Sequence, residues 1–144
     1  GFSSKGRVVM ITGSCHCQKV RFEIRGKLGA ITRCYCEDCR KLNGSAFAAV
    51  AVTQTADWHF ACGESHITHY ESSPGKLRGF CSTCHSPLYA YLTKQPELRR
   101  ARLGTLDAPL NVGAAPNAHI FVAECADWYA VPQDGAPQFA QWPQ

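Results

Sequence analysis

The sequence contains no long hydrophobic run. None of its apolar segments approaches the ~18–20 consecutive residues that a membrane-spanning helix needs, and the run Val8-Val9-Met10-Ile11 is too short for a secretory signal. Charged residues are also few, at 18%, whereas hydrophobic residues make up 45%. This is the composition of a globular chain rather than a disordered one. We therefore expect a soluble, cytoplasmic protein with no membrane partner.

The sequence also lacks internal repeats and low-complexity segments. Its 144 residues suit one domain. We expect that domain to span residues 10–144 and residues 1–9 to be vector-derived or disordered. The net charge is +4, but the basic residues are scattered, and Arg99, Arg100 and Arg102 form the one local cluster. We expect these arginines to be solvated, which disfavours a nucleic-acid partner and leaves room for a small anionic substrate.

Helix signals are sparse, and most segments have the pattern of short strands. Residues 19–25 alternate apolar with polar side chains, and residues 46–52 form a continuous apolar run. Residues 88–92 and 118–123 are further strand candidates, and residues 58–60 and 66–70 flank Gly63 like a hairpin. Residues 36–42 suit one helical turn, and residues 96–103 suit either a helix or a loop. The sequence predicts a mainly β, single-domain fold with short helical turns.

Cysteine, by contrast, is abundant, with nine residues in the chain. Disulfides need an oxidising compartment, to which nothing in the sequence directs the chain, and an odd count would leave one thiol over. Seven of the nine cysteines form three clusters, in which neighbouring cysteines are separated by one or two intervening residues. Neighbours this close are better placed to share a metal ion than to form a disulfide. We therefore expect these seven to bind zinc.

The spacing of the clusters indicates how the ligands divide. The pair Cys15 and Cys17 can join the pair Cys81 and Cys84 to complete a tetrahedral four-thiolate shell. Such a site would tie distant parts of the chain together and contribute folding free energy on the order of 10 kcal/mol. The alternative is a different partition of the seven thiols, with one four-cysteine site and three spare cysteines.

The remaining cluster is a compact unit of three cysteines, Cys34, Cys36 and Cys39. Three protein ligands with one open position are the pattern of a catalytic zinc. Cys62, Cys125 or one of the six histidines could instead close the shell, and the spacing alone does not decide between these two readings. His119 opens an apolar strand, so we expect a structural role for it.

These clusters and their surroundings resemble the glutathione-dependent formaldehyde-activating enzyme family, which includes the centromere protein V proteins. The matching stretches are Gly13-Ser14-Cys15-His16-Cys17, Cys34-Tyr35-Cys36 with Cys39-Arg40-Lys41 and Gly44-Ser45-Ala46-Phe47, Phe80-Cys81 with Cys84, and Trp128-Tyr129 with Asp134-Gly135. The resemblance spans about residues 11–139. The sequence departs from it at His85, where the family has a glycine suited to a left-handed turn; we expect the turn to survive because histidine tolerates that conformation better than most residues.

The resemblance implies an Mss4-like β fold with two zinc ions. Cys15, Cys17, Cys81 and Cys84 would hold a structural zinc, and Cys34, Cys36 and Cys39 a substrate-side zinc with an open position. The implied reaction joins glutathione and formaldehyde to S-(hydroxymethyl)glutathione, which is classed as a carbon–sulfur lyase reaction. An open zinc suits it by holding a thiol as thiolate.

Residues near the second cluster are the candidate substrate contacts. Arg40 and Lys41 could attract the carboxylates of glutathione or another thiol, and Ser45 and Phe47 could line the pocket. The alternative to an enzyme is a zinc-stabilised binding module for a protein or nucleic acid. Such a module would have a fourth protein ligand on the second zinc and a clustered basic face.

Overall fold

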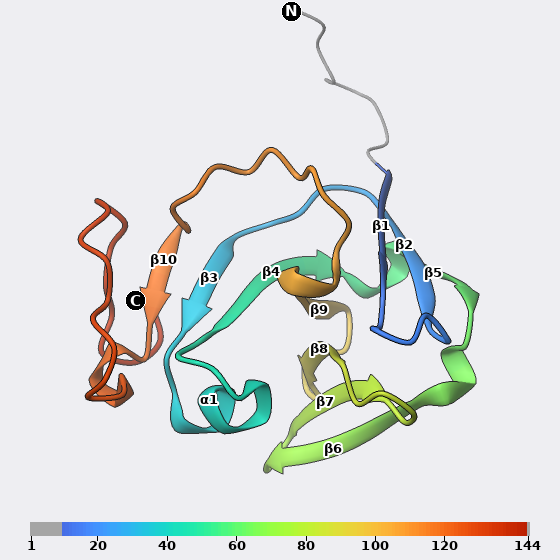
Figure 1. The fold of residues 1–144 in the computed structure, drawn as a ribbon, viewed down its shortest axis with the longest axis horizontal. Helices are drawn as coiled ribbons and strands as arrows, with labels where there is room; N and C mark the ends of the chain where they lie inside the picture. Colours follow the sequence, from blue (N-terminus) through green and yellow to red (C-terminus); the bar gives the residue numbers. More distant parts are fainter. Residues whose placement is uncertain (1–9, 144) are drawn as a thin grey trace, which may run out of the picture.

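The computed structural model describes residues 10–143, which form two β-sheets (Figure 1). The expectation for residues 1–9 lies outside this range. The smaller sheet has the strand order β1-β2-β5 and is antiparallel. Its strands are β1 (Met10–Ser14), β2 (Arg21–Arg25) and β5 (Trp58–Cys62).

The larger sheet has seven strands in the order β10-β3-β4-β9-β8-β7-β6, and only the β10–β3 pair is parallel. Its strands are β3 (Ile31–Cys34), β4 (Ala48–Gln54), β6 (Ile67–Ser73), β7 (Lys76–Cys81), β8 (Pro87–Leu92), β9 (Leu98–Arg102) and β10 (Ala118–Ile120). Among the described residues, one α-helix, α1 (Glu37–Asn43), joins β3 to β4. Short 3-10 turns occur at η1 (Thr55–Asp57), η2 (Glu64–His66), η3 (Leu103–Thr105) and η4 (Val122–Glu124).

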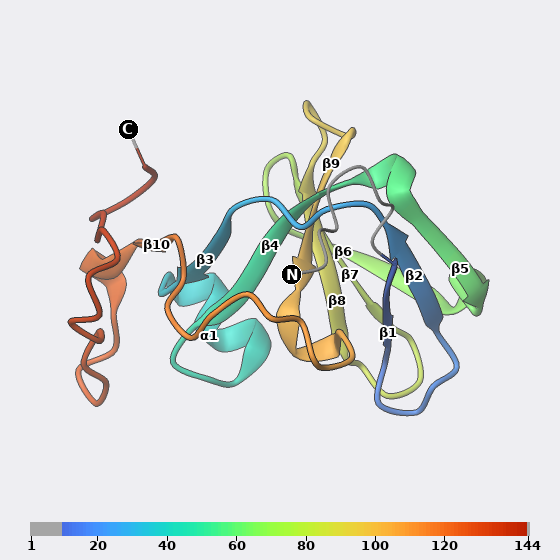
Figure 2. The ribbon, with the colours of Figure 1, turned by 90° about the horizontal axis from the view of Figure 1, so that it is seen from above.

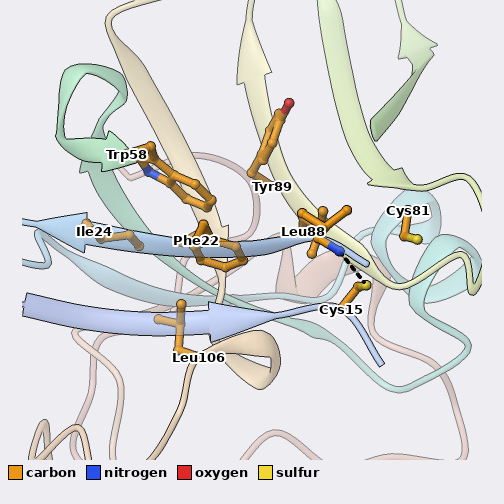
Figure 3. Close-up of a cluster of buried hydrophobic side chains, with 10 residues drawn as sticks. Cys15, Phe22, Ile24, Trp58, Cys81, Leu88, Tyr89 and Leu106 are labelled. Atoms are coloured by element: carbon orange, nitrogen blue, oxygen red, sulfur yellow. Dashed lines mark hydrogen bonds between the residues drawn. The ribbon is translucent and has the colours of Figure 1, made fainter. Parts of the chain in front are cut away.

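Alternation of side chains explains why the larger core forms between the two sheets. In β2, Phe22 and Ile24 are buried while the flanking arginines are exposed. Phe22 stacks on Trp58 of β5 with ring centroids 4.5 Å apart, and Tyr89 of β8 meets Trp58 edge-on at 5.5 Å. Figure 3 shows this cluster, with Cys15 and Cys81 at its Leu88 end.

A second, smaller buried cluster lies around the other cysteines. It consists of Cys34, Cys39, Ala48, Val50, Ala118 and Ile120. Figures 1 and 2 place β3, β10 and the C-terminal segment at the opposite end of the molecule from β1, β2 and β5. The two cysteine groups therefore belong to different parts of the fold.

Two local predictions are wrong. The segments around Gly63 do not form a hairpin, because β5 pairs with β2 and β6 pairs with β7. Gly63 has φ +82°, and a Cβ there would collide with the Lys19 carbonyl, so the chain turns from one sheet to the other at this point. Residues 98–102 form neither helix nor loop but strand β9, which fills the gap between β4 and β8.

The remaining expectations about the fold agree with the structure. The predicted mainly β, single-domain fold is confirmed, and the helical turn after the second cysteine cluster is α1. The strand predicted at 118–123 ends earlier, at Ile120, because Phe121 adopts a left-handed conformation and a 3-10 turn follows. Among residues 10–143, no helix is both long and apolar enough to cross a bilayer.

Candidate metal centres

The structure brings together the four cysteines predicted to share one ion. The Sγ atoms of Cys15, Cys17, Cys81 and Cys84 all lie within 4.8 Å of one another. Cys17 Sγ is 3.6 Å from Cys15 Sγ and 3.8 Å from Cys81 Sγ. A tetrahedral ion with metal–sulfur bonds of ~2.3 Å separates its ligands by about 3.8 Å. The four thiols therefore have the spacing of a four-thiolate metal site.

Two tight turns position these thiols and direct backbone N–H groups at them. The N–H of Val20 donates to Cys15 Sγ at 3.3 Å, and the N–H groups of Thr83 and Cys84 donate to Cys81 Sγ at 3.4 and 3.5 Å. Such donors stabilise negative charge on sulfur. The turn closes at His85, whose N–H donates to the Cys81 carbonyl and whose φ is +65°. The left-handed turn expected at His85 is thus confirmed.

The three-cysteine group is built from one continuous segment. Cys34 ends β3, Cys36 caps the N-terminus of α1 by accepting a hydrogen bond from the Cys39 N–H at 3.3 Å, and Cys39 lies in the first helical turn. The helix ends at Gly44, which has φ +61° and donates its N–H to the Arg40 carbonyl. The three Sγ atoms lie within 4.8 Å of one another. Among residues 10–143, no further His, Cys, Asp or Glu ligand atom belongs to this group.

A buried hydrogen-bonded chain fixes the segment from the other side. Tyr35, between the first two thiols, is fully buried, and its hydroxyl lies 2.8 Å from His119 Nδ1. His119 Nε2 lies 3.0 Å from an Asp134 carboxylate oxygen. Burial raises the pKa of Tyr35 to about 12, so its hydroxyl stays protonated. His119 thus has the structural role that we expected.

Strand register places four cations on the same face of the large sheet as Cys34. They are Arg100 and Arg102 of β9, and Lys76 and Arg78 of β7. Residues paired across strands share a face, and so do residues two apart along one strand. The pairs that connect Cys34 to these cations are Cys34–Ala48, Val50–Arg102, Val52–Arg100, Ala90–Arg100, Arg78–Ala90 and Lys76–Leu92. This face lies away from the core that contains Phe22 and Trp58.

These cations have thiols rather than carboxylates as their anionic neighbours. Arg78 Nη1 donates to Cys39 Sγ at 3.6 Å, and Arg78 and Arg102 are each only 6% exposed. No ion pair within residues 10–143 involves Lys76, Arg78, Arg100 or Arg102. Burying a positive charge without an anionic partner is costly, and none of these four cations has a carboxylate partner within residues 10–143, so this face is suited to receive negative charge.

The electrostatics of the thiols and cations are coupled. Hydrogen bonds from Cys34 and Cys36 lower the pKa of Cys39, and the positive charges of Arg78 and Arg102 lower it further. Burial lowers the pKa of Arg102 to about 10, while the negative charge of Cys39 opposes that shift. Burial and then repulsion from Arg78 lower the pKa of Lys76. The positive charges of Arg78 and Arg102 therefore favour negative charge on this group of thiols.

Two cavities flank the buried arginines. One, of about 200 Å³, has Cys34, Cys39, Lys76, Arg100, Arg102 and Trp142 in its wall, and we call it the cationic cavity. The other, of about 330 Å³, has mainly apolar walls, including Leu42, Tyr70 and Phe80, and contains no cysteine. Arg102 lines both cavities. Cys34 and Cys39 therefore border the cationic cavity and not the apolar one.

The predicted substrate contacts lie outside the walls of both cavities. Lys41 is exposed, with Nζ 3.9 Å from Glu37, and Arg40 is half-buried, with its Nε unpartnered among the described residues. Ser45 donates its hydroxyl hydrogen to the Phe47 carbonyl at 2.7 Å. The Phe47 ring packs on Tyr35 at 5.5 Å. The structure thus brings Phe47 against the ligand segment, and the roles of all four residues stay predictions.

The cations that line the cavity escaped the sequence analysis. Arg102 was expected to be solvated but is buried, and Arg99 lies on the opposite face, over the rings of Tyr89 and Trp58 at 4.1 and 5.0 Å. The local arginine cluster is therefore not one basic surface patch. The alternation of charged and apolar residues in Lys76-Leu77-Arg78 indicates that both cations lie on one face of a strand. It does not indicate what packs against that face.

The two isolated cysteines join neither group. All nine cysteines are free thiols. Cys62 is exposed, and its Sγ lies 3.5 Å from the Lys19 carbonyl oxygen, whereas Cys125 is half-buried. Neither is the fourth ligand of the three-cysteine group within the described structure.

Comparisons with known proteins show which family the chain belongs to. The profile of the family "Glutathione-dependent formaldehyde-activating enzyme" matches residues 10–124. A Halomonas elongata protein, provisionally named a glutathione-dependent formaldehyde-activating enzyme, is 31% identical over 130 residues, which are 85% of this chain and 82% of that protein. The crystal structure of a Rhodobacter sphaeroides protein superposes with a TM-score of 0.58 at 25% identity, covering 73% of this chain and 97% of the other. The chain therefore belongs to the glutathione-dependent formaldehyde-activating enzyme family.

Proposed function

We propose that this protein joins an anionic thiol, glutathione in the first instance, to formaldehyde or a related small electrophile at a zinc ion held by Cys34, Cys36 and Cys39. This would be a carbon–sulfur lyase reaction of the S-(hydroxymethyl)glutathione synthase type. The observation that carries the proposal is the position of this three-cysteine group in the wall of a cavity that also contains Lys76 and Arg102.

The donor sets fit two zinc ions. Four soft thiolates suit a closed structural site, and three suit a site with one position left for a substrate. We therefore assign Cys15, Cys17, Cys81 and Cys84 to a structural zinc that ties the turn after β1 to the end of β7 and the turn that follows it. At the other group, bound zinc would supply a Lewis-acidic position that holds a substrate thiol as thiolate at neutral pH.

The chain's own residues would orient the substrate and balance its charge. Arg78 donates to Cys39 and thereby offsets the negative charge of the ligand set. Lys76 and Arg100 lie in the cavity wall without carboxylate partners among the described residues, so they are available to the carboxylates of glutathione. Arg40 and Lys41 remain candidates for the same role, but the cavity geometry favours the first pair.

The proposed reaction is an addition and needs no co-reactant. The thiol sulfur forms a bond to the aldehyde carbon, the carbon–oxygen double bond becomes single, and the thiol proton ends on the new hydroxyl. The cations would hold the thiol near the electrophile, which is the contribution that positioning makes to a bimolecular step.

The test is the rate of S-(hydroxymethyl)glutathione formation, measured by exchange NMR with ¹³C-formaldehyde. The pH should be slightly acidic, where the uncatalysed addition is slow. The zinc-loaded protein should accelerate exchange, and Cys36→Ser should not. An unchanged exchange rate with protein that holds two zinc ions, together with no calorimetric heat at millimolar glutathione, would reject the proposed activity.

A further inference from the structure

The C-terminal segment partly closes the cationic cavity. Trp142 and Pro143 line it together with Cys34, Lys76 and Arg100. The volume that remains is about 200 Å³, whereas pockets that bury a small organic ligand usually measure ~300–1,000 Å³. A tripeptide thiol therefore needs more room than the cavity offers with Trp142 in place.

Trp142 lies over the two cations that a carboxylate would use. Its ring centroid is 5.6 Å from Lys76 Nζ and 5.9 Å from Arg100 Cζ, both within the range of cation–π attraction. The Trp142 ring also lies nearly perpendicular to the Phe121 ring, with the two centroids 5.1 Å apart. The indole thus partly satisfies two cations that have no carboxylate partner among residues 10–143.

The end of the tail is also the wall segment that can move at the lowest cost. The other walls belong mostly to strands held by ladder hydrogen bonds, whereas residues 141–143 lie outside any helix or strand. Within the described residues, the last backbone hydrogen bond of the tail joins the Phe121 N–H to the Gln141 carbonyl at 3.1 Å. Trp142 itself is 47% exposed. Phe121 has φ +55°, an unfavourable conformation for an aromatic residue and a kind of strain that clusters at switch points.

We propose that Trp142 is a displaceable cover over a carboxylate subsite formed by Lys76 and Arg100, and that an anionic thiol binds by replacing the indole on these two cations. The exchange is favourable because a charge-assisted hydrogen bond is stronger than a cation–π contact at a half-exposed site. The identity of the anion as a thiol substrate rests on the proposed function, but the displacement depends only on the carboxylate.

The cover should lower the apparent affinity for the anion, because only the open form binds it. The probe is S-methylglutathione, which keeps both carboxylates but has no free thiol. In calorimetry, Trp142→Ala should bind this probe about fivefold to tenfold more tightly than the wild type. Trp128→Ala is the matched control, since Trp128 is exposed and outside the cavity wall, and its affinity should equal that of the wild type. Equal or weaker binding by Trp142→Ala would overturn the proposal, because a residue that packs on the ligand would give that result.

A second measurement needs no ligand. In a Trp128→Phe background the remaining tryptophans are Trp142 and Trp58, and Trp58 is buried. Replacing Lys76 and Arg100 by methionine should release the indole and raise acrylamide quenching of tryptophan fluorescence about twofold. Unchanged quenching would reject the cation contacts. If S-methylglutathione binds neither the wild type nor Trp142→Ala, the proposed cover is rejected as well. The proposed activity is tested separately, by the exchange rate with glutathione and formaldehyde.

Discussion

The two cysteine groups use the same ligand chemistry in opposite surroundings. The four-cysteine group lies at one end of the larger core, and the charge on its sulfurs is met by backbone N–H groups. The three-cysteine group lies beside a cavity, and its charge is met not only by the Cys39 N–H but also by buried arginine side chains from β7 and β9. The backbone donors are held in place by their turns, whereas the arginine side chains also line the two cavities.

We expect this difference to separate a structural role for the four-cysteine group from a chemical role for the three-cysteine group. Cys15 and Cys17 lie in the turn after β1, and Cys81 and Cys84 lie at the end of β7 and in the turn that follows it. An ion there would join segments far apart in the sequence and so resist unfolding. Ligands drawn from one short segment, residues 34–39, add few long-range ties, so an ion there contributes less to the fold. Cations beside that ion that have no carboxylate partner among the described residues have a function only if an anion binds to them.

The largest expected effect is loss of the four-cysteine centre. Cys81→Ser should leave most of the protein unfolded, because a zinc contribution on the order of 10 kcal/mol is comparable with the whole stability of a domain, about 5–15 kcal/mol. Circular dichroism and zinc content would measure this. Cys62→Ser is the control, since that exposed thiol belongs to neither group. A cooperatively folded Cys81→Ser protein would contradict the structural role assigned to the four-cysteine centre.

Loss of the three-cysteine centre should give the reverse pattern. Cys36→Ser should hold one zinc ion instead of two and lose the acceleration of formaldehyde–glutathione exchange, while its melting temperature changes by only a few degrees. The cause is that Cys36 is half-buried and its group spans one local segment. Unfolding as severe as that of Cys81→Ser would show that both ions are structural.

A substitution of Arg78, the arginine beside Cys39, tests the difference between the two centres further. Arg78→Met should lower kcat/KM by roughly tenfold to a hundredfold, since a hydrogen bond to a charged group contributes about 1.5–3 kcal/mol. The matched variant near the other centre is Lys19→Gln, because Lys19 is exposed and contacts Thr83 at 3.4 Å. It should leave the kinetics unchanged. Equal effects of the two variants would mean that the cations of the large sheet have no special role.

The smallest effect concerns pH. Burial and then Arg78 lower the pKa of Lys76 from its ordinary value of 10.5. The protonated ammonium attracts a carboxylate, so the affinity for S-methylglutathione should fall as pH rises through that lowered value. Lys76→Met should bind more weakly near neutrality and lose this alkaline decline. An alkaline decline that survives in Lys76→Met would assign it to another group.

The sequence predicted how the clustered cysteines group in space, because that grouping depends on residue type and close spacing. Cys36-x-x-Cys39 is a helix N-cap as well as a ligand pair, so one local signal specified both the turn and the site. The division of seven thiols into four and three followed from the same spacing, and the structure groups them in that way.

The substrate-facing surroundings were not predictable, because they depend on strand pairing between distant segments. Arg102 reaches the Cys34 face only because β9 lies between β4 and β8, whereas the sequence of residues 96–103 suited a helix or a loop. Arg40 and Lys41 were chosen because they follow Cys39 in the chain, yet the cavity wall is formed by residues from β7 and β9. Proximity to Cys39 along the sequence therefore did not predict which residues lie close to it in the cavity wall.

The most direct test of the central distinction is ¹¹³Cd NMR of the cadmium-substituted protein, because each thiolate centre then gives its own resonance. Loss of one resonance in Cys36→Ser identifies the three-cysteine centre. We predict that added glutathione shifts this resonance alone, since its sulfur enters a position that the protein leaves open. A spectrum in which glutathione moves neither resonance, or moves the one that persists in Cys36→Ser, would contradict the assignment of one closed and one open centre.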